Sequence, residues 1–145
     1  MEIEPLYWDK YMVDMLLAGK KTQMCELLFH SSKEFQYRRA RVGDIATLGV
    51  RYNVGDILRV IAGGKQIYIR IVCYKIKILK NLTYENLEKE GCKTIDSHER
   101  TLKRFKIIWN RQHGENESWE MCRNTPIAVY DIEACENPKE ENEND

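Results

Sequence analysis

The stretch QIYIRIVCYKIKIL, residues 66–79, decides the fold. Two sets of apolar residues alternate along it in opposite phase: Ile67, Ile69, Ile71 and Cys73, then Tyr74, Ile76 and Ile78. A two-residue period that changes phase without an intervening loop indicates a β-bulge. Long, bent and bulged strands are typical of a sheet that curls into a small barrel. Arg70, Lys75 and Lys77 are read as solvated strand residues, with a ligand-facing surface as the alternative.

The flanking segments predict helices and further strands. Apolar residues from Trp8 to Leu16 recur with helical spacing, and Gly19 follows at the position of a helix-ending glycine. Thr83 is the expected N-cap of a short helix that ends at Gly91, and a second helix is expected from near Asp96.

Strands complete the pattern. The pentads RVGDI (41–45) and NVGDI (53–57) are read as tight turns that enter strands, and TPIAVYDIE (125–133) as a closing strand. The strands are too closely spaced for parallel crossovers. The sequence therefore predicts an α+β fold: a small curled β-barrel of about five to six strands, flanked by two to three helices.

Charge divides the chain of 145 residues into a body and a tail. The formal net charge is zero, but the last eleven residues carry five acids against one lysine, so residues 1–134 carry +4. An acidic segment this poor in apolar residues cannot bury enough surface to order itself. We therefore expect one domain over residues 1–134 and a disordered tail over residues 135–145. The mildly basic body permits an anionic partner.

Cysteines, histidines and hydropathy exclude several other classes of protein. The five cysteines form no C-x-x-C pair, and the three histidines lack the spacing of metal ligands. No long apolar run or signal peptide is present. The sequence thus predicts a cytoplasmic protein with no membrane segment, no metal and no cofactor.

Several blocks, in order, resemble the ASCH domain family, which belongs to the PUA-like superfamily. They are AGKKT (18–22), YNVGDILRV (52–60), IVCYKIKILKNLTYENLEKEG (71–91), FKIIWN (105–110) and SWEMCRNTP (118–126) leading into IAVYDIE (127–133). The arrangement is most similar to the ASCH proteins of phages and prophages. The resemblance implies a PUA-like barrel with a cleft near the first-helix lysine, used for RNA, a nucleotide or a modified nucleoside.

The resemblance also implies candidate catalytic residues. One branch of the family hydrolyses the acetyl amide of N4-acetylcytidine with a lysine and a threonine from a GxKTxTxR segment and a glutamate from the following short helix. Lys21 matches this lysine and Glu90 this glutamate, and Thr22 is a weaker candidate. Met24 stands where the second threonine is needed, and Glu26 replaces the arginine. Methionine can neither attack nor transfer a proton, so efficient catalysis is not expected.

Candidate binding residues have alternative interpretations that the sequence leaves open. Lys20 and Lys21 either contact the ligand or are solvated lysines that favour the helix C-terminus. Glu26 either pairs with one of these lysines or, at the cleft mouth, favours an amine, a guanidine edge, or the N–H donors of cytosine or guanine. Another group could supply phosphate contacts and a stacking platform: Arg38, Arg39, Arg41 and Tyr52.

Three functional hypotheses follow. The first is a small ASCH domain that binds RNA or a nucleotide-like ligand. The second is an amidohydrolase or ribonuclease that uses Lys21 and Glu90. The third is a phage-encoded module that binds a host protein.

Overall fold

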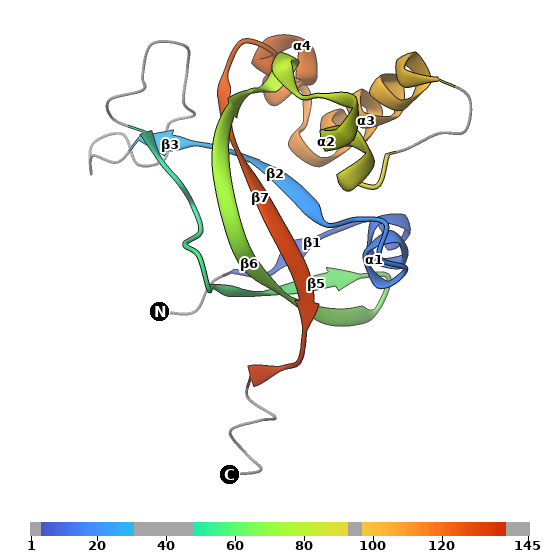
Figure 1. The fold of residues 1–145 in the computed structure, drawn as a ribbon, viewed down its shortest axis with the longest axis vertical. Helices are drawn as coiled ribbons and strands as arrows, with labels where there is room; N and C mark the ends of the chain where they lie inside the picture. Colours follow the sequence, from blue (N-terminus) through green and yellow to red (C-terminus); the bar gives the residue numbers. More distant parts are fainter. Residues whose placement is uncertain (1–3, 31–47, 93–96, 139–145) are drawn as a thin grey trace.

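A curled five-stranded sheet forms the body of the protein (Figure 1). The computed structural model describes residues 4–30, 48–92 and 97–138. The strand order is β1 (Leu6–Tyr7), β5 (Ile57–Ala62), β6 (Lys65–Ile78), β7 (Pro126–Cys135) and β2 (Gln23–Leu27). Only the β1–β5 pair is parallel among these neighbours; the others are antiparallel. The sheet is therefore mixed, and the predicted α+β fold with a curled sheet is confirmed.

A second, two-stranded sheet joins β3 (Phe29–His30) to β4 (Leu48–Gly49). The turn expected at residues 53–57 lies directly before β5, where the Asp56 carboxylate accepts a hydrogen bond from the Asn53 amide at 2.9 Å. The turn expected at residues 41–45 and the basic residues Arg38, Arg39 and Arg41 lie outside the described residues.

The bulge predicted in β6 is present. The register between β6 and β7 shifts between Ile71 and Cys73, where the residue phase changes in the sequence. Before the bulge, Ile69 and Ile71 are completely buried. A bulge bends its strand and increases the local twist, which lets one long strand pair with both β5 and β7 in a curled sheet.

Four α-helices occur in the described parts of the chain: α1 (Lys10–Leu17), α2 (Tyr84–Lys89), α3 (His98–His113) and the short α4 (Trp119–Cys122). The 3₁₀ turns η2 (Leu79–Asn81) and η3 (Glu115–Glu117) precede α2 and α4. Figure 1 shows α2, α3 and α4 grouped together, with α1 beside the sheet below them. Among the described residues, no helix has both the length and the apolar character needed to cross a membrane.

The helix ends agree closely with the sequence. Lys20 and Gly19 donate backbone hydrogen bonds to Met15 and Leu16, the paired bonds of a Schellman motif. Thr83 caps α2 in a capping box, and Gly91 follows the helix with a φ of 87°. The α3 helix begins one residue later than expected: its N-cap is Ser97, whose hydroxyl accepts a bond from the Arg100 amide.

Strand β7 is buried on both faces because it lies between two hydrophobic clusters. Ala128, Tyr130 and Ile132 face the inside of the curled sheet, whereas Ile127 and Val129 face the helices. Trp109 and Trp119 belong to the helix-side cluster. Both faces of the closing strand are thus used, one to fill the sheet interior and the other to attach the helices.

Candidate functional site

Lys21 and Glu90 form a buried ion pair next to the first helix. The two side chains belong to residues that are only 4% and 6% exposed. The Lys21 ammonium donates to Glu90 Oε2 at 3.0 Å, to the Glu90 backbone oxygen at 3.0 Å and to the Gln23 backbone oxygen at 2.8 Å. An ammonium has three N–H donors, so these acceptors use all of them. Lys21 is therefore not the solvated lysine that its position after a helix suggested.

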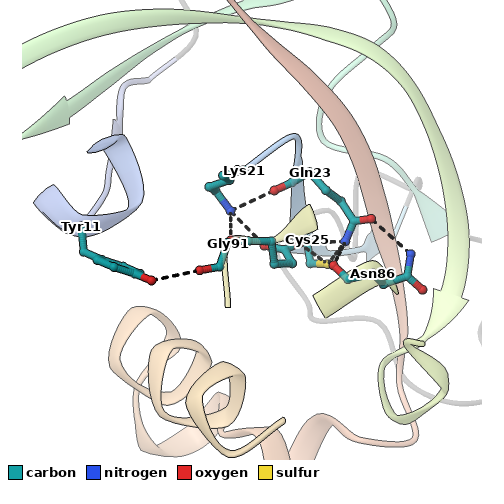
Figure 2. Close-up of polar contacts among 7 residues, drawn as sticks. Tyr11, Lys21, Gln23, Cys25, Asn86 and Gly91 are labelled. Carbon is teal, nitrogen blue, oxygen red and sulfur yellow. Dashed lines mark hydrogen bonds and ion pairs between the residues drawn. The ribbon is translucent and has the colours of Figure 1, made fainter. Parts of the chain in front are cut away.

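Glu90 is equally occupied. Its Oε1 accepts from Gln23 Nε2 at 3.2 Å and from the Cys25 thiol at 2.8 Å, while Oε2 accepts from Lys21. The Gln23 side chain also exchanges hydrogen bonds with Asn86 of α2 (Figure 2). This polar network connects the start of β2 to the end of α2, and its members hold one another in place.

Local backbone geometry places the pair. The Schellman turn at the end of α1 reverses the chain, and the Lys21 amide donates to the Met15 carbonyl at 3.1 Å. Gly91 approaches this turn from the other side: a Cβ at this position would lie 3.4 Å from the Cβ atoms of Lys21 and Met15. The glycine thus serves both a left-handed φ and a close approach between two segments.

A pocket of about 320 Å³ lies beside the ion pair. It is lined by residues of β1 and β2, the two edge strands of the curled sheet, and by one face of α3. Its polar lining includes Lys21, Glu26, Arg51, Glu90, Gln112 and His113. Its apolar lining includes Trp8, Met24, Phe105, Ile108 and Trp109. The volume lies at the lower end of the range of small-molecule sites, and the lining is mixed, with polar as well as apolar side chains.

Glu26 and Arg51 are opposite charges in this pocket that do not form an ion pair with each other. No side chain of the described residues donates a hydrogen bond to the Glu26 carboxyl or lies within ion-pair distance of it. Burial is the main cause that raises the pKa of Glu26 to about 7. The positive charge of Arg51 lowers this pKa, and the negative charges of Glu90 and Glu117 raise it. Near neutral pH, Glu26 therefore exchanges between acid and carboxylate.

Three other groups around the pocket, Cys25, Cys92 and His113, favour their neutral forms. Burial, followed by the Glu90 carboxylate, raises the pKa of Cys25 well above its usual value. Burial also raises the pKa of Cys92 to about 12 and lowers the pKa of His113. Neither thiol is thus a thiolate nucleophile at neutral pH.

The structure separates the residues predicted from the sequence. Lys21, Glu90 and Glu26 line one pocket, whereas Lys20 and Thr22 are exposed and do not line it. Of the two interpretations of Glu26, pairing with Lys20 or Lys21 is wrong: Lys21 pairs with Glu90, and among the described residues no ion pair joins Glu26 to Lys20.

The prediction that Tyr52 forms a stacking platform on the surface is wrong. Its residue is only 1% exposed, and its ring packs against Tyr130 inside the sheet with a centroid distance of 5.6 Å. A ring buried in this way fills the core and cannot stack on an incoming base.

Sequence reasoning did not find four of the polar lining residues. Gln112 and His113 extend the stripe of Phe105 and Trp109 at helical spacing, so the pattern of α3 contained this signal. Cys25 follows Gln23 on the same strand face, which strand alternation could have shown. Arg51 follows β4 by two residues, and no spacing rule marks it.

The described residues contain no group of three or more His, Cys, Asp or Glu side chains placed to hold a metal ion. The polar side chains around the pocket instead supply acceptors, at Glu26, and donors, at Arg51. This donor and acceptor set suits an organic ligand with both kinds of group.

No family model matches the chain, and no curated protein sequence matches it significantly. Solved structures do share its fold. An ASCH domain from Lactobacillus crispatus JV V101 is 14% identical, with a TM-score of 0.50, and the match covers 89% of this chain and 79% of that one. A DUF984 protein from Enterococcus faecalis V583 is 13% identical, with a TM-score of 0.53 and coverages of 99% and 83%. The chain therefore has an ASCH-like fold.

Proposed function

We propose that this protein is a small ASCH-like domain that binds a nucleotide-like ligand in the pocket between β1 and β2, without efficient catalysis. One observation carries the proposal: Glu26 and Arg51 line the same pocket without forming an ion pair with each other. A ligand with N–H donors and with an acceptor or phosphate would form hydrogen bonds with the Glu26 carboxyl and the Arg51 guanidinium, respectively. Unlike Tyr52, the aromatic residues Trp8, Phe105 and Trp109 line the pocket, and Trp8 is the least buried of the three, so it supplies the main apolar contact for a flat ring.

The pair that the family resemblance marks as catalytic is better explained as structural. Hydrolysis of an amide needs a nucleophile, a route for its proton and stabilisation of the oxyanion. Lys21 uses its three donors on protein acceptors, and both oxygens of Glu90 accept hydrogen bonds from protein donors. Thr22 is exposed away from the pocket, and the Cys25 thiol stays protonated. The pocket thus lacks an activated nucleophile among its described residues.

The charge on α3 supports RNA as one source of the nucleotide. This helix carries five basic residues against one acid: Arg100, Lys103, Arg104, Lys106 and Arg111, with Glu99. The same helix lines the pocket through Ile108, Gln112 and His113. A nucleotide within a strand could place its base in the pocket and neighbouring phosphates near the helix.

Isothermal titration calorimetry with nucleosides, their 5′-monophosphates and short single-stranded RNAs tests the proposal. We expect saturable binding that weakens in Glu26→Gln or Arg51→Gln and is unchanged in Lys20→Gln, whose site is exposed and outside the pocket. RNA binding should also weaken steeply with salt. Absence of binding by every probe, or equal loss in the Lys20 variant, would overturn the proposal. Release of acetate from N4-acetylcytidine by the wild-type protein would overturn its non-catalytic part.

A further inference from the structure

The pocket holds two carboxyl groups in opposite situations. Glu90 receives three hydrogen bonds from protein donors. Glu26, two positions beyond Met24 on β2, receives none from the described residues, although it lines the same pocket. A partly buried acceptor has lost hydrogen bonds to water, and without protein donors these bonds are not replaced, which costs free energy. Glu26 is therefore the group whose hydrogen-bonding capacity a ligand would fill.

A carboxylate accepts two parallel hydrogen bonds when two N–H groups lie side by side, as in its bidentate pairing with arginine. Among nucleobases, guanine offers this arrangement through N1–H and the amino group on C2. Adenine and cytosine each offer an amino group beside an unprotonated ring nitrogen, whose lone pair would face the second carboxylate oxygen. Uracil has only one ring N–H on this edge, between two carbonyl groups.

We infer that the pocket selects a guanine-type edge, with two adjacent N–H donors received on the Glu26 carboxylate. This inference rests on the proposed function and names the ligand class of the same pocket. Arg51, which also lines the pocket, supplies N–H donors for an acceptor or phosphate of that ligand. The family resemblance implies an arginine at this position; Glu26 presents acceptors in its place, so the ligand edge that it suits changes from acceptors to donors.

Protonation of Glu26 should change which base the pocket prefers, so the preference should depend on pH. The carboxylate form, dominant above the pKa of about 7, suits guanine. The acid form has one donor and one acceptor, so it suits adenine or cytosine instead.

Several other charged and titratable groups surround Glu26. They are Lys21 before β2, Cys25 of β2, Arg51 and Tyr52 before β5, Glu90 after α2, His113 of α3, Glu117 of η3 and Tyr130 of β7. Burial raises the pKa of Cys25 and Tyr52 and lowers that of His113, which keeps all three neutral between about pH 7 and 8. Glu26 is therefore the group expected to titrate in this range.

Calorimetric titrations of the full chain with guanosine, inosine, adenosine and cytidine test the inference at about pH 8 and about pH 6. Inosine lacks only the amino group on C2. At the higher pH we expect guanosine to bind about tenfold tighter than inosine, since one well-formed bidentate contact discriminates by about 5-fold to 150-fold. Guanosine affinity should fall at the lower pH. Circular dichroism confirms that each variant is folded.

Glu26→Gln should lose the preference for guanosine over inosine and the dependence on pH, because its amide presents one acceptor and one donor. Glu117→Gln is the matched control: it removes a nearby charge that does not line the pocket, and it should keep the guanosine preference. Equal binding of guanosine and inosine at the higher pH, or guanosine affinity that stays constant or rises at the lower pH, would overturn this inference alone. No binding of any nucleoside or nucleotide would overturn the proposed function with it.

Discussion

Replacing Lys21 by methionine keeps an unbranched apolar side chain and removes the ammonium with its three hydrogen bonds of 2.8 to 3.0 Å. The Glu90 carboxylate then remains buried with Gln23 and Cys25 as donors but without a cation. Breaking a buried ion pair in this way typically costs about 3–5 kcal/mol. For a domain of this size, each kcal/mol lowers the melting temperature by roughly 3–4 °C, so we expect a drop of about 10–20 °C.

Urea unfolding followed by circular dichroism measures this loss, with a constant m-value as evidence that the two-state comparison holds. The double variant Lys21→Met/Glu90→Gln should recover much of the stability, because removing both charges leaves no uncompensated ion. Lys20→Met is the control, since Lys20 is exposed. A loss below about 1 kcal/mol in Lys21→Met, as for an exposed lysine, would refute the structural role assigned to the pair.

Two further changes test the surroundings of the pocket. The folded-state pKa of Glu26 lies above its unfolded value of 4.5, so its contribution to stability is fully present below about pH 4.5 and is lost as pH rises through about 7. The free energy of unfolding of wild type should therefore fall relative to Glu26→Gln between about pH 5 and 8, by at most about 3 kcal/mol and less because the residue is partly exposed. A constant difference in urea unfolding would contradict the raised pKa. Gly91→Ala and Gly19→Ala should each destabilise by about 1–3 kcal/mol through their left-handed φ, because a Cβ at Gly91 would reach only ordinary contact distance from Lys21 and Met15. A melting temperature equal to that of wild type in either variant would argue against the left-handed conformation at that glycine.

The sequence predicted the features that depend on local rules. The bulge between Ile71 and Cys73 follows from a change of phase in the strand pattern, and the turn at Gly19 follows from the spacing of α1 and its glycine. Both features arise from residues that are neighbours along the chain. Local periodicity is enough to find such elements.

The site depended on contacts that local rules do not reach. Lys21 and Glu90 are 69 positions apart, and their mutual burial follows only from the packing of α1, β2 and α2. Tyr52 follows a short strand and precedes a turn, so its sequence context resembles a loop, but the curled sheet encloses its ring. The family resemblance brought Lys21 and Glu90 together as a pair, although their hydrogen bonds indicate a structural role.

The most direct test compares the two carboxyl groups of the pocket. In protein labelled with ¹³C at the glutamate carboxyls, guanosine is titrated at about pH 8, where Glu26 is ionised. We expect the Glu26 signal to shift with saturation while the Glu90 signal stays in place, because protein donors already occupy both of its oxygens. A shift of Glu90 with an unchanged Glu26 would contradict the account and assign the ligand to the Lys21–Glu90 pair.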